Sequence, residues 1–488
     1  MKDQTGLKYL DPEFYKAYQS CKRLVWFGWH LTDGVLLDPW QDDSLINLAK
    51  GLFPHHLDAG KESSCLEETV EISKKCVRSN KTVFNACFTS SIGVAVADII
   101  TPLGEDSKEL IFVCPTKGIH PLFIEKIAFT TAVLIKNGIE LKKISLLRIN
   151  PEFKKESEFN PRNYFIKQII TGRVALRVNN VEDNVSEIFR IIKSEEPPAH
   201  VYDKRCLSPF VCPFFENCWQ MPPEQNILSL YRGSKKIKKL IETGICDLTQ
   251  ISDEIELTER QKIQVTSAKT GEPFVNKPAI KKFLRKLVYP LHFIDFETVS
   301  SPLPLFKGTR PFELIPYEFS LNIQEHPGGD VQTTNYIARG DDDPRREIMK
   351  ILNEKIQSYG SVIAYNAQFE KHCLQSCARA LHDYSAWVDD VSKRMVDLLE
   401  PFKALHYYHP AQRGSASLKS VLPCLTGKGY THFAIRNGEE ASKQFIKLFR
   451  DEVLDEKKEM ILHELETYCY TDSIGMLWII EALKKLVE

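Results

Sequence analysis

Apolar runs and amphipathic stretches alternate along the carboxy-terminal part of the chain. Short runs rich in apolar residues occur at 291–296 and 361–365, and longer stretches with a helical period occur at 344–358, 367–381 and 462–486. Strands separated by helices of this length are typical of α/β domains. We therefore predict an α/β domain over residues 288–488.

The part of the chain before residue 288 has a different pattern. Its first 225 residues mix helical stretches with a strand pair near 94–100 and 110–113, and they end in a segment rich in cysteine and proline. Residues 226–287 form short, charged, helical stretches with basic clusters at 235–239 and 281–286. A chain of 488 residues is too long for one core. We predict a first domain (1–225), a helical connector (226–287) and the α/β domain.

The composition and charge of the chain bear on its location and on what it can bind. Hydrophobic residues make up 43% of the chain and charged residues 26%, as in ordinary globular proteins. The chain shows no signal pattern and no apolar run of membrane length, so we expect a cytoplasmic location and no membrane partner. The net charge of −1 gives no overall attraction to nucleic acid, so such binding would need a local basic surface. The 13 cysteines are expected to be reduced thiols or metal ligands.

Two carboxylates lie two positions apart in the first strand of the predicted α/β domain. Asp295 and Glu297 are surrounded by apolar residues, and the period of a strand places both on one face. Paired carboxylates in a buried strand are costly unless a cation joins them. Oxygen ligands suit Mg²⁺ or Mn²⁺. From this pair alone, a metal site and a chance pairing are about equally supported.

Two further pieces carry similar chemistry. Glu370 lies in the first turn of the helix that follows the second strand, where the helix dipole favours a negative charge. Tyr468 and Asp472 are four residues apart on the last helix, and this spacing places them on one helical face. Each piece alone is a weak signal, because such residues are common in helices.

Taken together and in this order, the three pieces resemble the three motifs of the DEDD superfamily of 3′–5′ exonucleases, which have a ribonuclease-H-like fold. The resemblance implies that Asp295, Glu297 and Asp472 bind one divalent ion and that Asp295 and Glu370 hold a second. It also implies that Tyr468 orients the attacking water in a two-metal hydrolysis of phosphodiester bonds.

Some positions refine this resemblance. Thr467 stands where the histidine subclass has His, so the tyrosine subclass fits. Glu370 stands where the family usually has Asp, and its extra methylene moves the carboxylate by about 1.5 Å, which would weaken the second metal site. Asp397 lies in a short predicted strand and is favoured as a cap or strand-end carboxylate over a catalytic residue. Lys419, in a segment that resembles the approach to the substrate strand, is either a phosphate contact or a solvated side chain.

Three evenly spaced cysteines close the first domain. Cys206, Cys212 and Cys218 lie among prolines that favour a wrapping loop, and three thiolates need a fourth ligand. Cys21, in an early helix, resembles the first ligand of the iron–sulfur nucleases related to the RecB nuclease domain, which include CRISPR-associated exonucleases. This resemblance implies a [4Fe–4S] cluster held by all four cysteines. Zinc and buried thiols without a ligand are the two alternatives.

The RecB-like resemblance continues into the predicted strand pair and then fails. Asp98 matches the first acid of the PD-(D/E)XK motif, but Phe112 and Cys114 stand where that motif has Glu and Lys, and Thr130 replaces an expected Gln. We therefore expect a catalytically inactive nuclease fold that serves as a scaffold or binds nucleic acid. In the connector, the turn at Gly244 is either a helix-hairpin-helix-like phosphate contact or an ordinary linker.

This order of domains resembles, over nearly the whole chain, a bacterial protein family of unknown function. The sequence predicts a metal-dependent 3′–5′ exonuclease that acts on DNA or RNA, at single-stranded 3′ ends. One rival is a scaffold in which both nuclease folds are catalytically silent. Another is an endonuclease or repair factor that works under a partner such as a helicase. Binding of divalent ions separates the exonuclease from the silent scaffold.

Overall fold

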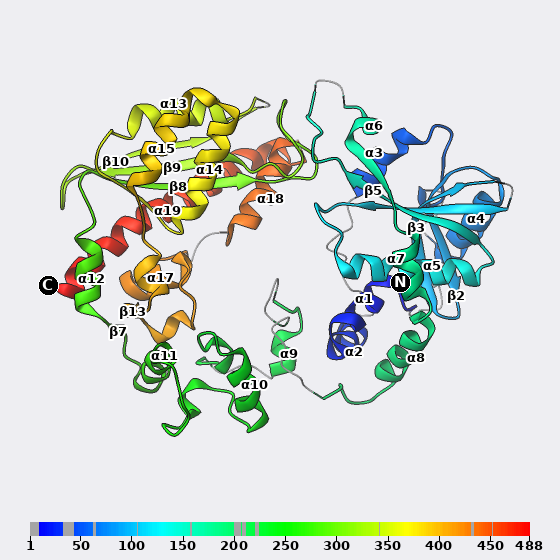
Figure 1. The fold of residues 1–488 in the computed structure, drawn as a ribbon, viewed down its shortest axis with the longest axis horizontal. Helices are drawn as coiled ribbons and strands as arrows, with labels where there is room; N and C mark the ends of the chain where they lie inside the picture. The colour runs from blue at the N-terminus through cyan, green and yellow to red at the C-terminus, as the bar shows by residue number, and fades with distance from the viewer. Residues whose placement is uncertain are drawn as a thin grey trace. The chain divides into compact units, whose positions relative to one another are not determined.

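The structure is a computed structural model, and it describes residues 9–32, 43–61, 65–104, 106–156, 159–199, 206, 211–219, 224–340, 342–430, 434–450 and 452–488 (Figure 1). The chain divides into two compact units. The first contains residues up to 220 together with 310–312, and the second contains 221–309 and 313–488. The predicted connector, 226–287, belongs to the second unit.

A six-stranded sheet forms the centre of the first unit, in the order β1-β2-β3-β4-β5-β6. Its strands are β1 (Leu57–Asp58), β2 (Val83–Ser90), β3 (Gly93–Pro102), β4 (Ser107–Cys114), β5 (Glu140–Ile149) and β6 (Phe165–Ile169). Strands β2, β3 and β4 form an antiparallel meander. The helix α5 (Pro121–Lys136) then crosses over, so that β5 runs parallel to β4. The strand pair predicted near 94–100 and 110–113 is confirmed as β3 and β4.

Helices cover this sheet and one another. They are α1 (Pro12–Ser20), α2 (Lys22–Leu31), α3 (Asp43–Ala49), α4 (Leu66–Arg78), α6 (Pro161–Tyr164), α7 (Thr171–Val178), α8 (Val181–Ile192) and α9 (Phe215–Trp219). The helix α5 is apolar on nearly every side, and it packs between the sheet and the helices α1 and α7. Phe14, Tyr15 and Phe129 are fully buried at this junction, which fixes α1 against α5.

The connector is helical, as its charge pattern predicted. It contains α10 (Ser234–Glu242), α11 (Glu259–Thr270) and α12 (Lys277–Leu284). Gly244 has the left-handed backbone that ends α10, and a short 3-10 helix (Leu248–Gln250) follows it. A two-residue strand, β7 (Phe274–Val275), pairs with β13 (Tyr407–Tyr408), so the connector packs against later parts of its own unit.

The second unit contains a five-stranded sheet in the order β10-β9-β8-β11-β12. Its strands are β8 (Leu291–Val299), β9 (Ile315–Gln324), β10 (Val331–Ile337), β11 (Ser361–Ala364) and β12 (Met395–Asp397). Strands β8, β9 and β10 are antiparallel, whereas β11 and β12 run parallel to β8. The strands predicted at 291–296 and 361–365 are confirmed.

Helices cover both faces of this sheet (Figure 1). They are α13 (Arg345–Lys355), α14 (Ala367–Ala380), α15 (Ser385–Arg394), α16 (Glu400–Lys403), α17 (Leu418–Thr426), α18 (Gly438–Phe449) and α19 (Asp455–Val487). Ile294 and Phe296 of β8 pack toward α13 and α14, whereas Leu291 and Phe293 pack toward α17 and α19. The alternation of a strand therefore turns Asp295 toward α19.

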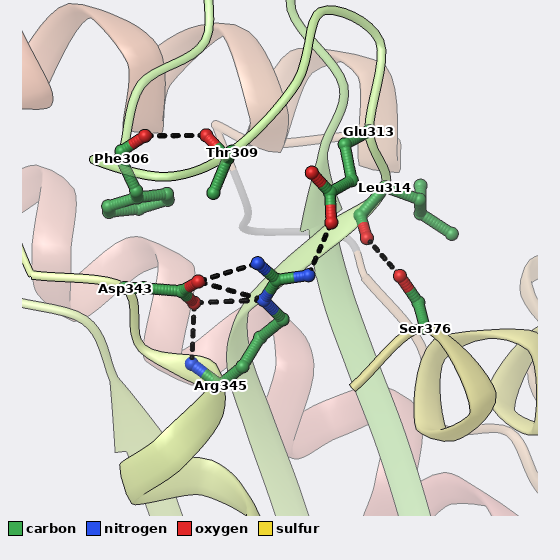
Figure 2. Close-up of polar contacts among 7 residues, drawn as sticks. All are labelled: Phe306, Thr309, Glu313, Leu314, Asp343, Arg345 and Ser376. Atoms are coloured by element: carbon green, nitrogen blue, oxygen red, sulfur yellow. Dashed lines mark hydrogen bonds and ion pairs between the residues drawn. The ribbon is translucent and has the colours of Figure 1, made fainter. Parts of the chain in front are cut away.

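One buried arginine joins the layers on the α13 side. Arg345, at the start of α13, forms ion pairs with Asp343 and with Glu313, just before β9 (Figure 2). Close by, the hydroxyl of Ser376 in α14 donates to the carbonyl of Leu314 at 3.0 Å. These contacts hold the start of β9 against the helical layer.

Among the helices that the structure describes, none has both the length and the apolarity needed to cross a membrane.

Candidate metal centre

Three carboxylates from two elements meet beside the sheet of the second unit. Asp295 and Glu297 come from β8, and Asp472 comes from α19, which packs over that strand. One oxygen of each lies within 4.8 Å of the oxygens of the other two. Glu297 and Asp472 are buried, and Asp295 is half-buried. The packing of α19 over β8 therefore brings together the strand face and the helical face that the sequence predicted.

Glu370 approaches the same place from the first turn of α14. It shares a cavity of about 310 Å³ with Asp295 and Glu297. Asn366 has a left-handed backbone that turns the chain from β11 into α14, and this turn points Glu370 inward. The side chain is 3% exposed, and its Oε2 has no hydrogen-bond partner among the described residues. A buried carboxylate oxygen without a hydrogen-bond partner is costly, and coordination of a cation would offset that cost.

Burial and mutual repulsion raise the pKa values of these carboxyl groups. Burial, followed by the charges of Asp472 and Glu297, raises the pKa of Asp295 well above its usual range. The pKa of Glu297 rises to about 8, mainly because of burial and then because of Asp472. Burial also raises the pKa of Glu370 to about 8 and that of Asp472 to about 6. The cluster therefore ionises fully near neutral pH only if cations offset its charge.

Two tyrosines and a lysine border the carboxylates. The hydroxyl of Tyr430 donates to Oδ1 of Asp472, and Nζ of Lys419 donates to the hydroxyl of Tyr468. The ammonium group of Lys419 lies 4.3 Å from the centre of the Tyr468 ring and 5.5 Å from that of Tyr430. Lys419 is half-buried and bonded within the protein, so it is not a freely solvated side chain.

Three neighbours of the site were not found from the sequence. Tyr430 lies in the chain segment after α17, and no local pattern marked it. Glu318 of β9 lies opposite Glu297 in register, and its Oε2 is buried without a hydrogen-bond partner among the described residues. Its signal was a lone carboxylate in a strand of mostly apolar residues. The thiol of Cys469 lies 3.6 Å from Oδ2 of Asp295.

Asp397 has the structural role that the sequence favoured. Its Oδ1 accepts the backbone N–H of Asn366 at 2.9 Å and that of Leu399 at 3.0 Å. These bonds hold the turn that places α14, and with it Glu370, beside the cavity. Asp397 is therefore a strand-end carboxylate, and it is the cap of neither α14 nor α16.

The four predicted cysteine ligands lie near one another in the first unit. Cys21 precedes α2, and the N–H of Cys212 donates to the carbonyl of Cys206 at 2.9 Å. Burial raises the pKa of the Cys212 thiol, and negative charge on Cys218, Cys206 and Cys21 raises it further. Arg23 donates to Sγ of Cys218 at 3.4 Å. The structure therefore gathers residues that are almost 200 positions apart.

The positions compared with the PD-(D/E)XK motif lie in the core of the first unit. Oδ2 of Asp98 in β3 accepts the backbone N–H of Val113 at 2.9 Å. Phe112 and Cys114 are fully buried, and so is Thr130 on α5. Apolar side chains therefore occupy the strand positions where that motif has Glu and Lys.

Comparisons with known proteins reach only part of the chain. Residues 292–417 match a family described as a domain of unknown function (DUF2779). The matched range contains Asp295, Glu297 and Glu370, and it ends before α17 and α19. No solved structure matches the chain.

Two curated relatives share about a fifth of their aligned residues with this chain. "Uncharacterized protein MG366" of Mycoplasma genitalium is 23% identical over 228 residues, which cover 42% of this chain and 33% of the relative. "Uncharacterized protein MG366 homolog" of Mycoplasma pneumoniae is 22% identical over 218 residues, which cover 41% of this chain and 33% of the relative. The chain spans about a third of the length of these relatives. Function therefore has to be argued from the site.

Proposed function

We propose that this protein is a metal-dependent 3′–5′ exonuclease, which removes nucleotides one at a time from the 3′ end of a DNA or RNA strand. The observation that carries the proposal is the trio of Asp295, Glu297 and Asp472, whose oxygens lie within 4.8 Å of one another. Three carboxylates at this distance do not stabilise the fold by themselves, because buried like charges repel one another.

The sheet of the second unit supports this class of enzyme. Three antiparallel strands are followed by two parallel ones, in the order β10-β9-β8-β11-β12, and this arrangement fits the ribonuclease-H-like sheet that the resemblance implies. In DEDD exonucleases, the first motif lies on the first strand of the sheet and the last motif lies on a final helix. The corresponding residues of this chain lie on β8 and α19. The fold and the acidic trio therefore favour the same proposal.

The donor set fits hard divalent cations. Every candidate ligand is a carboxylate oxygen, which suits Mg²⁺ or Mn²⁺ better than softer ions. Asp295, Glu297 and Asp472 would hold one ion, and Asp295 and Glu370 would hold a second. When bound, the ions would lower the pKa of a water molecule and neutralise charge on the phosphate.

The protein's own groups would orient the reacting atoms. In the proposed hydrolysis, the oxygen of water bonds to phosphorus and the P–O3′ bond breaks, which releases a nucleoside 5′-monophosphate and leaves a new 3′-hydroxyl. The hydroxyl of Tyr468 would orient that water beside Asp472. Tyr430 would hold Asp472 in place through its hydrogen bond to Oδ1.

The first unit would grip the nucleic acid without cutting it. Its order of α4, β2, β3, β4, α5 and β5 supports a RecB-like nuclease fold. Phe112 and Cys114 leave that fold without the Glu and Lys of its motif, so catalysis would belong to the second unit. A helicase or a repair complex is a fitting partner for such a protein.

The same unit would hold a [4Fe–4S] cluster on Cys21, Cys206, Cys212 and Cys218. A single tetrahedral zinc ion, about 2.3 Å from each sulfur, would bring the sulfurs to about 3.8 Å from one another. Thiolate ligands suit an iron–sulfur cluster as well as zinc. The resemblance to the iron–sulfur nucleases related to the RecB nuclease domain favours the cluster.

Optical absorption of anaerobically purified protein tests the cluster. We expect a broad band at about 400 nm, which Cys206→Ser removes and Cys424→Ser, at a cysteine of the second unit, retains. A colourless protein with one zinc per chain would exclude the iron–sulfur assignment.

Degradation of end-labelled substrates tests the exonuclease. Single-stranded DNA and RNA, labelled at either end, are incubated with the full chain and Mn²⁺. We expect stepwise shortening from the 3′ end, abolished by Asp295→Ala and Asp472→Ala and retained by Asp389→Ala, at an exposed carboxylate of the same unit. If neither substrate is cut although both are bound, the protein is the silent scaffold.

A further inference from the structure

Lys419 is held at the edge of the carboxylate cluster by contacts from several segments. It lies in the first turn of α17, and its Nζ donates to the carbonyl of Arg436 at 2.6 Å and to the hydroxyl of Tyr468. The ring faces of Tyr430 and Tyr468 enclose the same ammonium group. Its position is therefore fixed by α17, α19 and the chain between them.

The half-buried position of this lysine is unusual, because lysine side chains mostly keep the ammonium group in water. The ring of Tyr430 faces the ammonium group, and the hydroxyl of the same tyrosine donates to Asp472. The lysine therefore lies one side chain away from the carboxylates. A positive charge at this place attracts the carboxylates and repels a cation that binds among them.

We propose that Lys419 is a positioning residue of the proposed exonuclease site, with two linked tasks. Its Nζ fixes the hydroxyl of Tyr468, and its charge is a built-in counter-ion that partly offsets the carboxylates and opposes a divalent cation that binds among them. The inference rests on the proposed function, and it names a residue outside the three motifs.

Hydrogen-bond directions link the two tasks. Nζ is a donor only, so the phenol oxygen of Tyr468 accepts its proton and the phenol's own proton points elsewhere. Asp472 lies one helical turn after Tyr468 on the same face of α19. The contact with Lys419 thus restricts the direction of the hydroxyl that would orient the attacking water. Without the ammonium group, the hydroxyl is free to rotate.

Binding of Mn²⁺ in the absence of nucleic acid tests the counter-ion. The full chain and Lys419→Gln are titrated with Mn²⁺ in a calorimeter. Removing a competing positive charge should tighten Mn²⁺ binding by about three- to tenfold, because charge interactions at this depth are only partly screened. Structural damage has the opposite effect. Lys428→Gln, at a lysine that lies over the ring of Trp478, is the control and should leave the affinity unchanged.

Nuclease kinetics test the link to Tyr468. Lys419→Gln should lower kcat by about 100-fold, as expected for loss of one organising donor. In a Tyr468→Phe background the same change should cost less than about threefold, because the hydroxyl that it positions is already absent. Lys419→Arg should keep the Mn²⁺ affinity within about twofold and recover part of kcat.

The outcomes separate this inference from the proposed function. If the wild type binds no Mn²⁺, both are overturned. If the wild type binds Mn²⁺ and Lys419→Gln binds it more weakly at an unchanged Tm, only the counter-ion role is overturned. If the losses from Lys419→Gln and Tyr468→Phe multiply in the double variant, Lys419 does not act through Tyr468.

Discussion

The hydroxyl of Tyr430 donates a hydrogen bond to Oδ1 of Asp472, and this bond ties the segment after α17 to the last helix. Because it stabilises the carboxylate, the bond lowers the pKa of Asp472 against the effect of burial. It also fixes the direction from which Asp472 can offer its other oxygen to a metal ion. Tyr430 therefore supports a ligand without being one.

Removal of this hydroxyl should weaken the metal site. We expect Tyr430→Phe to reduce Mn²⁺ affinity or exonuclease activity by about 10- to 100-fold, the usual effect of losing a group that orients a ligand. Calorimetric titration and the end-labelled assay measure the two quantities. Tyr359→Phe, at a tyrosine that is 59% exposed, is the control. Equal affinity and activity in both variants would show that the bond to Asp472 is dispensable.

The stability of the metal-free protein should fall as the pH rises. Glu297 and Glu370 have pKa values of about 8 in the folded protein, and Asp472 has a pKa of about 6. All three are raised above the ordinary carboxyl range, so the folded chain holds these protons more tightly than the unfolded chain. The free energy of unfolding therefore decreases from about pH 4.5 to about pH 8.

Thermal unfolding in EDTA measures this effect. We expect Tm to fall by about 5 to 10 °C over that pH range and to fall less in Glu297→Gln, which removes one of the titrating groups. Mn²⁺ replaces the protons, so it should raise Tm more at pH 8 than at pH 6. If Tm falls by the same amount with pH in the wild type and in Glu297→Gln, the pKa of Glu297 is not raised.

Neutralising one carboxylate should raise the stability of the metal-free protein and abolish its stabilisation by Mn²⁺. Asp295→Asn fixes the neutral form of a side chain whose ionised form is opposed by burial and by the charges of Asp472 and Glu297. We expect the variant without metal to have a higher Tm than the wild type at pH 8, by about 2 to 5 °C, and to gain no stability from Mn²⁺. Differential scanning calorimetry with and without the ion gives both values. A lower Tm in EDTA would mean that Asp295 has a structural role.

The ion pairs of Arg345 support the fold at a distance from the site. This side chain is 5% exposed and pairs with Asp343 and Glu313. Arg345→Ala should lower the free energy of unfolding by about 2 to 4 kcal/mol, because it removes a buried guanidinium group that pairs with two carboxylates. Chemical denaturation measures the loss. Arg346→Ala, at the exposed neighbouring arginine, is the control. Equal free energies of unfolding in the two variants would show that the ion pairs of Arg345 do not stabilise the fold.

Local patterns in the sequence predicted several elements of the second unit. A short apolar run predicted β8, the two-residue period of a strand predicted the shared face of Asp295 and Glu297, and helical spacing predicted the shared face of Tyr468 and Asp472. Such patterns reflect contacts within one element, so they can be recognised without knowledge of the rest of the chain. The same reasoning predicted the helical connector and the strand pair of the first unit.

The tertiary structure decided which distant residues meet. Tyr430 and Asp472 are 42 positions apart, and Lys419 and Tyr468 are 49 apart, so no local period links them. The pairing of Glu297 with Glu318 depends on the register of β8 and β9. The sequence by itself determined the elements and the chemistry that each carries, because these depend on neighbouring residues. Packing between elements decided how that chemistry is assembled, because it depends on the whole fold.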